Sequence, residues 1–260
     1  MTNRITQIKE NRPLIHCITN PISIMQCANA ILLLGGRPIM AEHPEEVAQI
    51  TETSSALLLN LGNVTRDRIE AMKLSFQVAN ASGIPTVIDA VGVACSTLRR
   101  DLLKELLSKR NPALPLLIKG NYSEIQALTD PDYSASGVDA DRSLSFEEAK
   151  KSAGSLARSL KAIVLCTGPK DIVTDGERLA VIKNGTPQLG TITGTGCMLG
   201  AICATFWAVD TSLKSTALAT AAFGICGENA EGDLFLMRLF DEIGKLSDAD
   251  IAENMQISWE

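Results

Sequence analysis

The chain has 260 residues, of which 45% are hydrophobic, 4% aromatic and 21% charged, and its formal net charge at pH 7 is −6. This composition predicts a globular protein with a large core, and we expect the whole length, residues 1–260, to form a single domain. The negative charge argues against nucleic acid or an anionic membrane surface as the main partner, and the scarcity of aromatic residues argues against a base-stacking surface.

Seven cysteines are scattered along the chain without any Cys-x-x-Cys pair. An odd number of dispersed thiols is typical of reduced, cytoplasmic proteins. The first residues lack the apolar core of a signal peptide, and no apolar run is long enough for a membrane span. With only His16 and His43 present, a metal site built from several histidines is excluded.

Short apolar runs alternate with helical patterns through the first two thirds of the chain. Continuous apolar runs such as 56–61 are typical of parallel strands that are buried on both faces. The alternation therefore predicts an α/β fold with a mostly parallel central sheet covered by helices on both faces. We expect extended segments at 13–20, 37–41, 56–61, 84–89, 116–119 and 162–167, and helices at 23–34, from 44, 65–82, 97–109, from 121 and 146–160.

The pattern changes after residue 168. Two short apolar runs around Asp175-Gly176 predict a β-hairpin over 171–182. The remaining chain has helical patterns over 196–208, 213–229 and 233–243.

Residues 193–200 read Thr-Gly-Thr-Gly-Cys-Met-Leu-Gly and lead into an apolar helical run. The first turn of a helix has backbone N–H groups without partners and carries partial positive charge. The stretch therefore predicts an anion site formed by the backbone of Gly194, Thr195, Gly196 and Cys197. Its spacing fits neither a dinucleotide fingerprint nor a Walker A loop. A turn that only allows close helix packing is the alternative reading.

Polar residues stand where the predicted strands end. In a parallel sheet the carboxyl ends of the strands share one edge, and ligands collect there. Asp89 and Glu124 supply the hard oxygen atoms that Mg²⁺ prefers, and Lys119 supplies positive charge for phosphate. Asn60 and Thr167 close two further strands. Any one of these residues has an alternative role as a simple cap or turn residue.

With these motifs assembled, the chain resembles the hydroxyethylthiazole kinases of the ribokinase-like superfamily. The resemblance covers nearly the whole chain and is carried by residues 16–20, 35–41, 89–93, 119–125 and 193–199. It implies a ribokinase-like fold, with ATP-dependent phosphorylation of the primary alcohol of 4-methyl-5-(2-hydroxyethyl)thiazole in thiamine salvage. It also implies Mg²⁺ and a homotrimer with active sites at the subunit interfaces.

The resemblance further implies roles for single residues. Cys197 matches the position next to the reacting alcohol, where other kinases of the superfamily usually have aspartate. A thiol is a poor general base when neutral, so Cys197 either accepts the proton as a thiolate or only positions the alcohol. The implied contacts are Asn20, Met40 and Gly194 with the substrate, Lys119 and Thr167 with ATP, and Asp89 and Glu124 with Mg²⁺ and phosphate.

Three alternatives stay open. The first is an acyl-transfer enzyme with Cys197 as nucleophile and His16 or His43 as base. The second is a nucleotide- or anion-binding domain without catalysis on the same scaffold. The third is a related hydroxymethylpyrimidine or pyridoxal-type kinase.

Four positions depart from the residues usual in the family. We expect the Cβ of Ala94 to narrow a phosphate site, because glycine is common at that position. The other departures are Cys17, Ala90 and Pro169.

Overall fold

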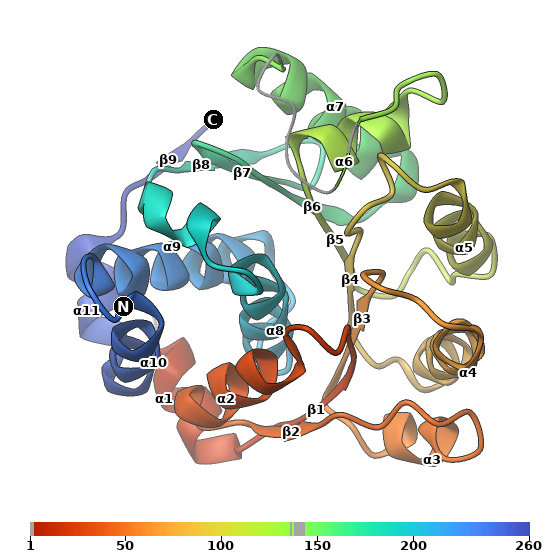
Figure 1. Ribbon diagram of the computed structural model, residues 1–260, viewed down its shortest axis with the longest axis horizontal. Helices are drawn as coiled ribbons and strands as arrows, with labels where there is room; N and C mark the ends of the chain where they lie inside the picture. Colours follow the sequence, from red (N-terminus) through yellow and green to blue (C-terminus); the bar gives the residue numbers. More distant parts are fainter. Residues whose placement is uncertain (1–2, 136, 138–143) are drawn as a thin grey trace.

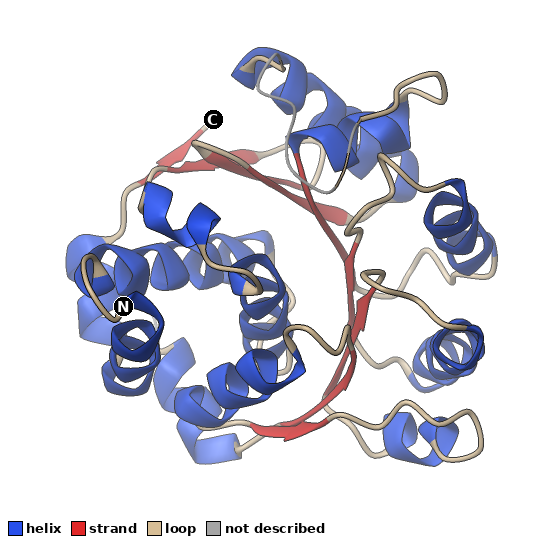
Figure 2. Cartoon of the chain, viewed as in Figure 1, coloured by secondary structure: helices blue, strands red, loops and turns tan. Residues whose placement is uncertain are grey.

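The computed structural model describes residues 3–135, 137 and 144–260, and its centre is one nine-stranded sheet (Figures 1 and 2). The strands are β1 Leu14–Ile18, β2 Arg37–Ile39, β3 Ala56–Asn60, β4 Thr86–Asp89, β5 Leu116–Asn121, β6 Ile163–Thr167, β7 Asp171–Thr174, β8 Leu179–Ile182 and β9 Ile257–Trp259. Their order is β2-β1-β3-β4-β5-β6-β7-β8-β9. Strands β1 to β6 pair in parallel, and β7 to β9 add an antiparallel edge.

Helices cover both faces of the sheet, as the alternating pattern predicts (Figure 1). One face carries α1 Arg4–Asn11, α2 Ile24–Leu34, α8 Thr195–Trp207, α9 Leu213–Ala230, α10 Phe235–Lys245 and α11 Asp248–Asn254. The other carries α3 Val47–Glu52, α4 Arg66–Ser82, α5 Thr97–Ser108, α6 Tyr122–Thr129 and α7 Phe146–Leu160.

Two hydrophobic clusters, one on each face of the sheet, form the core. Successive side chains of a strand point to opposite faces. In β3, Leu58 therefore joins the cluster with α8, whereas Leu57 and Leu59 join the cluster with α4. Continuous apolar runs are needed because both faces are buried.

The antiparallel hairpin of β7 and β8 is confirmed, with Gly176 in its turn at φ 94°. Four elements were not expected: α1, α11, β9 and a short 3₁₀ helix, η1 Pro187–Thr191. The first two depend on contacts between the ends of the chain, since the backbone N–H groups of Ile5 and Thr6 donate to the carboxylate of Asp248. The helix expected from residue 44 begins only at Val47, after a turn.

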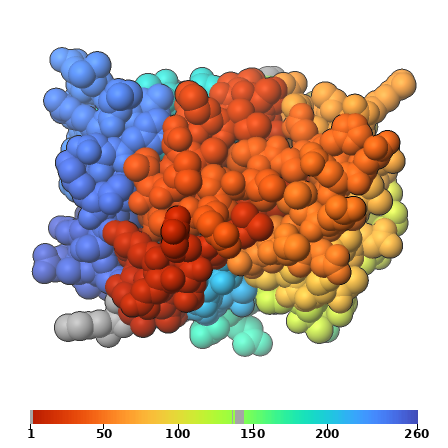
Figure 3. All heavy atoms as spheres, turned by 90° about the horizontal axis from the view of Figure 1, so that it is seen from below, coloured from red at the N-terminus to blue at the C-terminus, as the bar shows by residue number. Residues whose placement is uncertain are grey.

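The first and last parts of the chain pack together. Helix α2 contacts both α8 and α10. Figure 3 shows the N-terminal segment in red and orange beside the C-terminal helices in blue. Within the described part of the chain, no helix has the length and apolar character to span a membrane.

Candidate active site

Helix α8 begins at the glycine-rich stretch, one residue earlier than expected, with Gly194 as its N-cap. Gly194 has φ 95°, and a Cβ there would lie 2.3 Å from Oε1 of Gln26, so only glycine fits this turn. No side chain caps the helix. The hydroxyl of Thr195 donates instead to the carbonyl oxygens of Leu189 and Ile192, at 2.6 and 3.0 Å, and so closes the preceding loop. The backbone donors of the first turn have no side-chain cap, as an anion site requires.

Three polar side chains form a row across the carboxyl ends of neighbouring strands. The sheet register pairs Asn60 of β3 with Asp89 of β4, and Asp89 with Lys119 of β5. All three are buried, and by the alternation of the strands they point toward α8. The prediction that these strand ends meet at one edge is confirmed.

Glycines of α8 bring the helix close to this row. A Cβ at Gly200 would lie 3.3 Å from Oδ2 of Asp89, and one at Gly196 would lie 3.9 Å from Nζ of Lys119. The small residues therefore place the start of the helix directly against the ion pair.

Lys119 and Asp89 form a buried ion pair, in which Nζ lies 3.1 Å from both carboxylate oxygens. Burial raises the pKa of Asp89, and the charge and hydrogen bond of Lys119 offset part of that shift. Burial alone would lower the pKa of Lys119, but the neighbouring negative charge, first of all that of Asp89, raises it above its ordinary value. Lys119 therefore keeps its positive charge at neutral pH.

Cys197 lies in the first turn of α8 and is half-buried. Its sulfur accepts a hydrogen bond of 3.3 Å from Nδ2 of Asn20. The same nitrogen donates to Oδ1 of Asn60 at 3.2 Å, and Nδ2 of Asn60 donates to Asp89 at 3.1 Å. A continuous chain of hydrogen bonds thus joins the thiol to the buried ion pair.

Glu124 is fixed at the start of α6 by a capping box with Asn121. Its two carboxylate oxygens accept backbone N–H bonds from Gly92 and Asn121, each 2.8 Å long. Burial, followed by the charge of Asp89, raises the pKa of Glu124 to about 7 despite these bonds. The positive charge of Lys119, at the same edge of the sheet, offsets part of this rise in the pKa of Glu124.

A pocket of about 620 Å³ opens beside the start of α8. Thr167 at the end of β6, Asp171 of β7 and Gly196 of α8 line it, and Phe223 of α9 adds an apolar wall. The volume and mixed lining are suitable for a nucleotide. Thr167 is therefore at a pocket wall, as the prediction of an ATP contact requires.

The sequence did not predict the outer wall of this pocket. Residues 183–187 form it, and Asn184 is tied to Glu228, to the carbonyl oxygen of Asn254 at 3.0 Å and to the N–H of Gln256 at 2.6 Å. Gly224 allows α9 to approach, because a Cβ there would lie 2.6 Å from the backbone of Asn184. The Asn184-Gly185 turn signal was visible, but its long-range partners were not.

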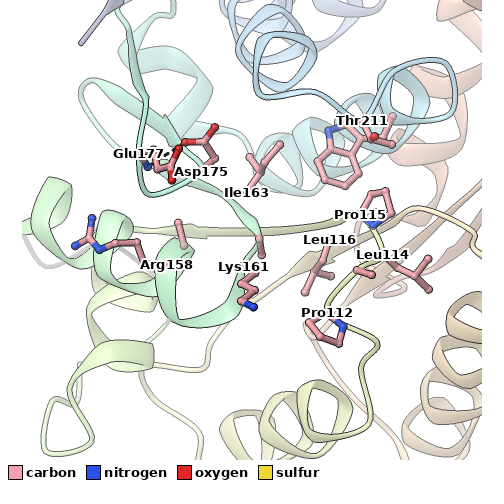
Figure 4. Close-up of a pocket in the computed structure, with 14 residues that line it drawn as sticks. Pro112, Leu114, Pro115, Leu116, Arg158, Lys161, Ile163, Asp175, Glu177 and Thr211 are labelled. Carbon is pink, nitrogen blue, oxygen red and sulfur yellow. Dashed lines mark hydrogen bonds between the residues drawn. The ribbon is translucent and has the colours of Figure 1, made fainter.

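A second pocket, of about 540 Å³, lies at the opposite edge of the sheet (Figure 4). Leu116 and Ile163, which start β5 and β6, contribute to its lining together with Arg158 and Lys161. It contains none of the polar row and no part of the glycine-rich turn. The carboxyl edge is therefore the better candidate site.

The acyl-transfer alternative lacks a base. The ring nitrogens of His16 bond to Oγ1 of Thr51 and to the carbonyl oxygen of Ala41, each at 2.9 Å, and burial lowers its pKa. Nδ1 of His43 accepts from the N–H of Glu45. Within the described residues, neither histidine hydrogen bonds to Cys197.

Met40 follows β2 and is half-buried against the core cluster that also includes Cys197. Of the four departures from the family pattern, Cys17, Ala90 and Ala94 are buried. Ala94 does not contribute to the 620 Å³ pocket, whereas Pro169 lies in its lining.

Over the ranges 3–135, 137 and 144–260, no three His, Cys, Asp or Glu side chains gather closely enough to hold a metal ion. Nucleotide-bound Mg²⁺ usually takes one or two carboxylates and completes its shell with water and phosphate oxygens. Asp89 and Glu124 fit that smaller requirement, because Oδ1 of Asp89 and each oxygen of Glu124 accept one hydrogen bond and keep a lone pair. The site suits an ion that arrives with a nucleotide rather than a resident one.

Comparison with known proteins gives consistent matches over the chain. The model of the hydroxyethylthiazole kinase family matches residues 5–249. Hydroxyethylthiazole kinase 2 of Clostridium botulinum is 42% identical over 260 residues, which are 96% of this chain and 97% of that protein. The hydroxyethylthiazole kinase structure from Pyrococcus horikoshii OT3 has a TM-score of 0.89 at 32% identity, covering 99% of this chain and 98% of that one. A Staphylococcus aureus pyridoxal kinase, solved with AMP-PCP and pyridoxal, shares the fold with a TM-score of 0.64 at 15% identity and covers 95% and 98%.

Proposed function

Because the chain belongs to the hydroxyethylthiazole kinase family, we propose that its site transfers the γ-phosphoryl group of ATP to the primary alcohol of 4-methyl-5-(2-hydroxyethyl)thiazole. The observation that carries this proposal is the position of the start of α8 between a pocket and a chain of hydrogen-bonded side chains. The uncapped first turn of α8 borders the 620 Å³ pocket on one side and the chain of Asn20, Asn60 and Asp89 on the other.

Phosphoryl transfer depends mainly on positioning and on stabilising negative charge. The backbone N–H groups of Gly194, Thr195, Gly196 and Cys197 lie at the start of α8 and would hold the transferring group; of these, that of Thr195 also donates to the carbonyl oxygen of Ile192 at 3.5 Å. Lys119 retains its charge beside them and would neutralise phosphate oxygens. Thr167 would contact the nucleotide in the pocket that it lines.

The alcohol would lie beside Cys197, with Asn20, Met40 and Gly194 as the neighbouring residues of the substrate side. Cys197 would accept the proton of the alcohol as the O–P bond forms, or would align the hydroxyl for that step. Cys197 is half-buried, so part of the residue stays accessible for such a contact. Asp89 and Glu124 would hold Mg²⁺ that enters with ATP, which supplies further charge neutralisation.

We also propose that the whole chain forms one kinase domain that acts in the cytoplasm as a homotrimer. All seven cysteines are free thiols, as in reduced compartments. Beside Asn20, Ile22 and Met25 are 66% and 70% exposed, and Leu32 continues this apolar stripe along α2. Burial of the stripe against a second copy would complete the substrate side of the site.

The experiment is a phosphate-transfer assay with ATP, MgCl₂ and three alcohols: the thiazole, hydroxymethylpyrimidine and pyridoxal. Mass spectrometry of the products identifies the phosphate ester. We expect the thiazole to be the best substrate, and we expect EDTA to abolish the reaction. Preferential phosphorylation of either other alcohol would contradict the substrate assignment, and absence of any ester would contradict the kinase.

A further inference from the structure

Asn20 has no free hydrogen-bonding capacity in its amide. Its Oδ1 accepts from the N–H of Ile22 at 3.1 Å and from the N–H and hydroxyl of Ser23, both at 3.2 Å. Its Nδ2 donates one proton to Asn60 and the other to the sulfur of Cys197. An amide NH₂ has only two protons, so none is left for a substrate.

The direction of this amide is determined from both ends. Backbone N–H groups can only donate, so the two at Ile22 and Ser23 hold the oxygen of Asn20 toward themselves. On the other side, the carboxylate of Asp89 can only accept, so Asn60 turns its NH₂ toward Asp89 and its oxygen toward Asn20. The N–H of Gly62 donates to the same oxygen at 2.9 Å. The orientation therefore follows from donors and acceptors that cannot be reversed.

The backbone at Gly62 leaves no room for a different arrangement of the Asn20 and Asn60 side chains. A Cβ at Gly62 would lie 2.8 Å from Oδ1 of Asn60 and 3.0 Å from Nδ2 of Asn20. Asn20 is 6% exposed and Asn60 is fully buried. Low exposure strengthens these bonds relative to those at the surface.

We propose that Asn20 is a positioning residue that acts through Cys197 and does not hydrogen bond to the substrate. Its N–H donation fixes the sulfur, stabilises a thiolate when one forms, and leaves the accessible part of this half-buried residue for the alcohol. This inference rests on the proposed kinase function and deepens it, because it replaces direct substrate recognition by Asn20 with control of the reacting thiol.

The test is Asn20→Asp, which keeps an oxygen for the N–H groups of Ile22 and Ser23 but cannot donate to Cys197. The first readout is the rate at which iodoacetamide alkylates Cys197 at pH 7.5 in the protein without ATP or alcohol. A hydrogen bond to a charged group contributes about 1.5–3 kcal/mol, so we expect the rate to fall about tenfold to a hundredfold. Peptide mapping separates this site from exposed Cys95, whose rate in the same sample should stay constant.

The second readout is the kinetics with the thiazole. We expect kcat to fall by a similar factor, with KM changed less than about threefold, since an interaction made through the thiol is not a uniform binding contact. Asn63→Asp is the matched control, because it adds the same charge at an exposed position after β3. We expect it to change either readout less than about twofold.

If Asn20→Asp does not fold by circular dichroism, Asn20→Ser replaces it, because a serine oxygen can still cap the N–H of Ser23 without reaching the sulfur. An unchanged alkylation rate with a raised KM would show that Asn20 binds substrate, and would overturn the proposal. An unchanged alkylation rate together with unchanged kcat and KM would also overturn the proposal. Alkylation is measured without substrates, so its result stands even if the wild-type protein fails to phosphorylate the thiazole.

Discussion

Cys197 combines a place in the first turn of α8 with a hydrogen bond from Asn20, and together they hold its sulfur at the start of the helix. We expect Cys197→Ala to reduce kcat on the order of 10²-fold, as is typical when a general base is removed. Cys197→Asp should stay active, because a carboxylate also accepts from Asn20 and is a base at neutral pH. Cys197→Ser should fall between them. Steady-state kinetics with the thiazole measure all three.

A Cys197→Ala enzyme as fast as the wild type would end the catalytic interpretation of this residue. Thermal unfolding of each variant is the control, since the half-buried Cys197 also packs against the core. A variant that loses activity but keeps its unfolding midpoint has lost chemistry rather than structure.

The sequence predicted the residues of the site better than their connections. Asn60, Asp89 and Lys119 could be identified because apolar strands end there, and parallel strands bring such ends together. The register that aligns them in one row depends on packing across the sheet, which no local pattern encodes. The hydrogen bond between Asn20 and Cys197 joins positions 177 residues apart, so it could not be read from either motif.

Helices α7 and α8 each contain a glycine, and the space available for a side chain differs between the two positions. A Cβ at Gly154 in α7 would meet only the Arg158 guanidinium, at 3.4 Å or more, whereas one at Gly200 in α8 would press on Asp89 at 3.3 Å. We expect Gly154→Ala to raise the free energy of unfolding by about 0.5–1 kcal/mol, because alanine loses less backbone entropy on folding. Gly200→Ala should lower it, since Lys119 and Asn60 hold the Asp89 carboxylate in place.

Urea unfolding at pH 7.5 measures both variants on the same scale. The prediction is wrong if Gly154→Ala lowers the free energy of unfolding, or if Gly200→Ala raises it as much as Gly154→Ala does.

The elements that the sequence did not predict are those with the least local signal. Helix α1 buries only Ile5 and Ile8, and β9 has three residues, so neither repeats a pattern long enough to be recognised. Both exist because distant parts of the chain supply partners. By contrast, α7 was predicted over Phe146–Leu160 with the correct bounds, and its capping box of Ser145 and Glu148 is a local signal.

For the molecule as a whole, the apolar stripe of Ile22, Met25 and Leu32 predicts self-association. We expect light scattering after size-exclusion chromatography to give the mass of a trimer. Met25→Glu places a charge in the stripe and should shift the protein toward monomer, with a loss of thiazole kinase activity if the site needs a neighbouring copy. Exposed Leu98→Glu, on α5 of the other face, is the control and should remain trimeric. A monomeric, active wild-type protein would contradict the proposed assembly.

Stability should depend on pH through Glu124. Its pKa of about 7 lies above the ordinary value of 4.5, so the folded state holds the proton more tightly than the unfolded state. The stabilisation is therefore complete below about pH 4.5 and is lost as pH rises through 7, by about 3 kcal/mol. Urea unfolding of metal-free protein at pH 5 and pH 8 measures the total loss. Glu124→Gln should remove its own share, while Asp171, whose pKa burial also raises to about 7, still contributes. Equal pH dependence in both proteins would show that Glu124 titrates normally.

The hydrogen bonds that hold Asn184 have a consequence for biosynthesis. Residues 254 and 256, which hold Asn184, and β9, which covers β8, are translated after every other strand of the sheet. Until then, β8 has a bare edge and the 183–187 wall is held through Glu228 and Glu231, although the turn at Gly194 is already synthesised. The strands of the parallel sheet are therefore all synthesised before the backbone partners that complete the hydrogen bonds of Asn184, so this wall of the 620 Å³ pocket reaches its final arrangement after the sheet can form.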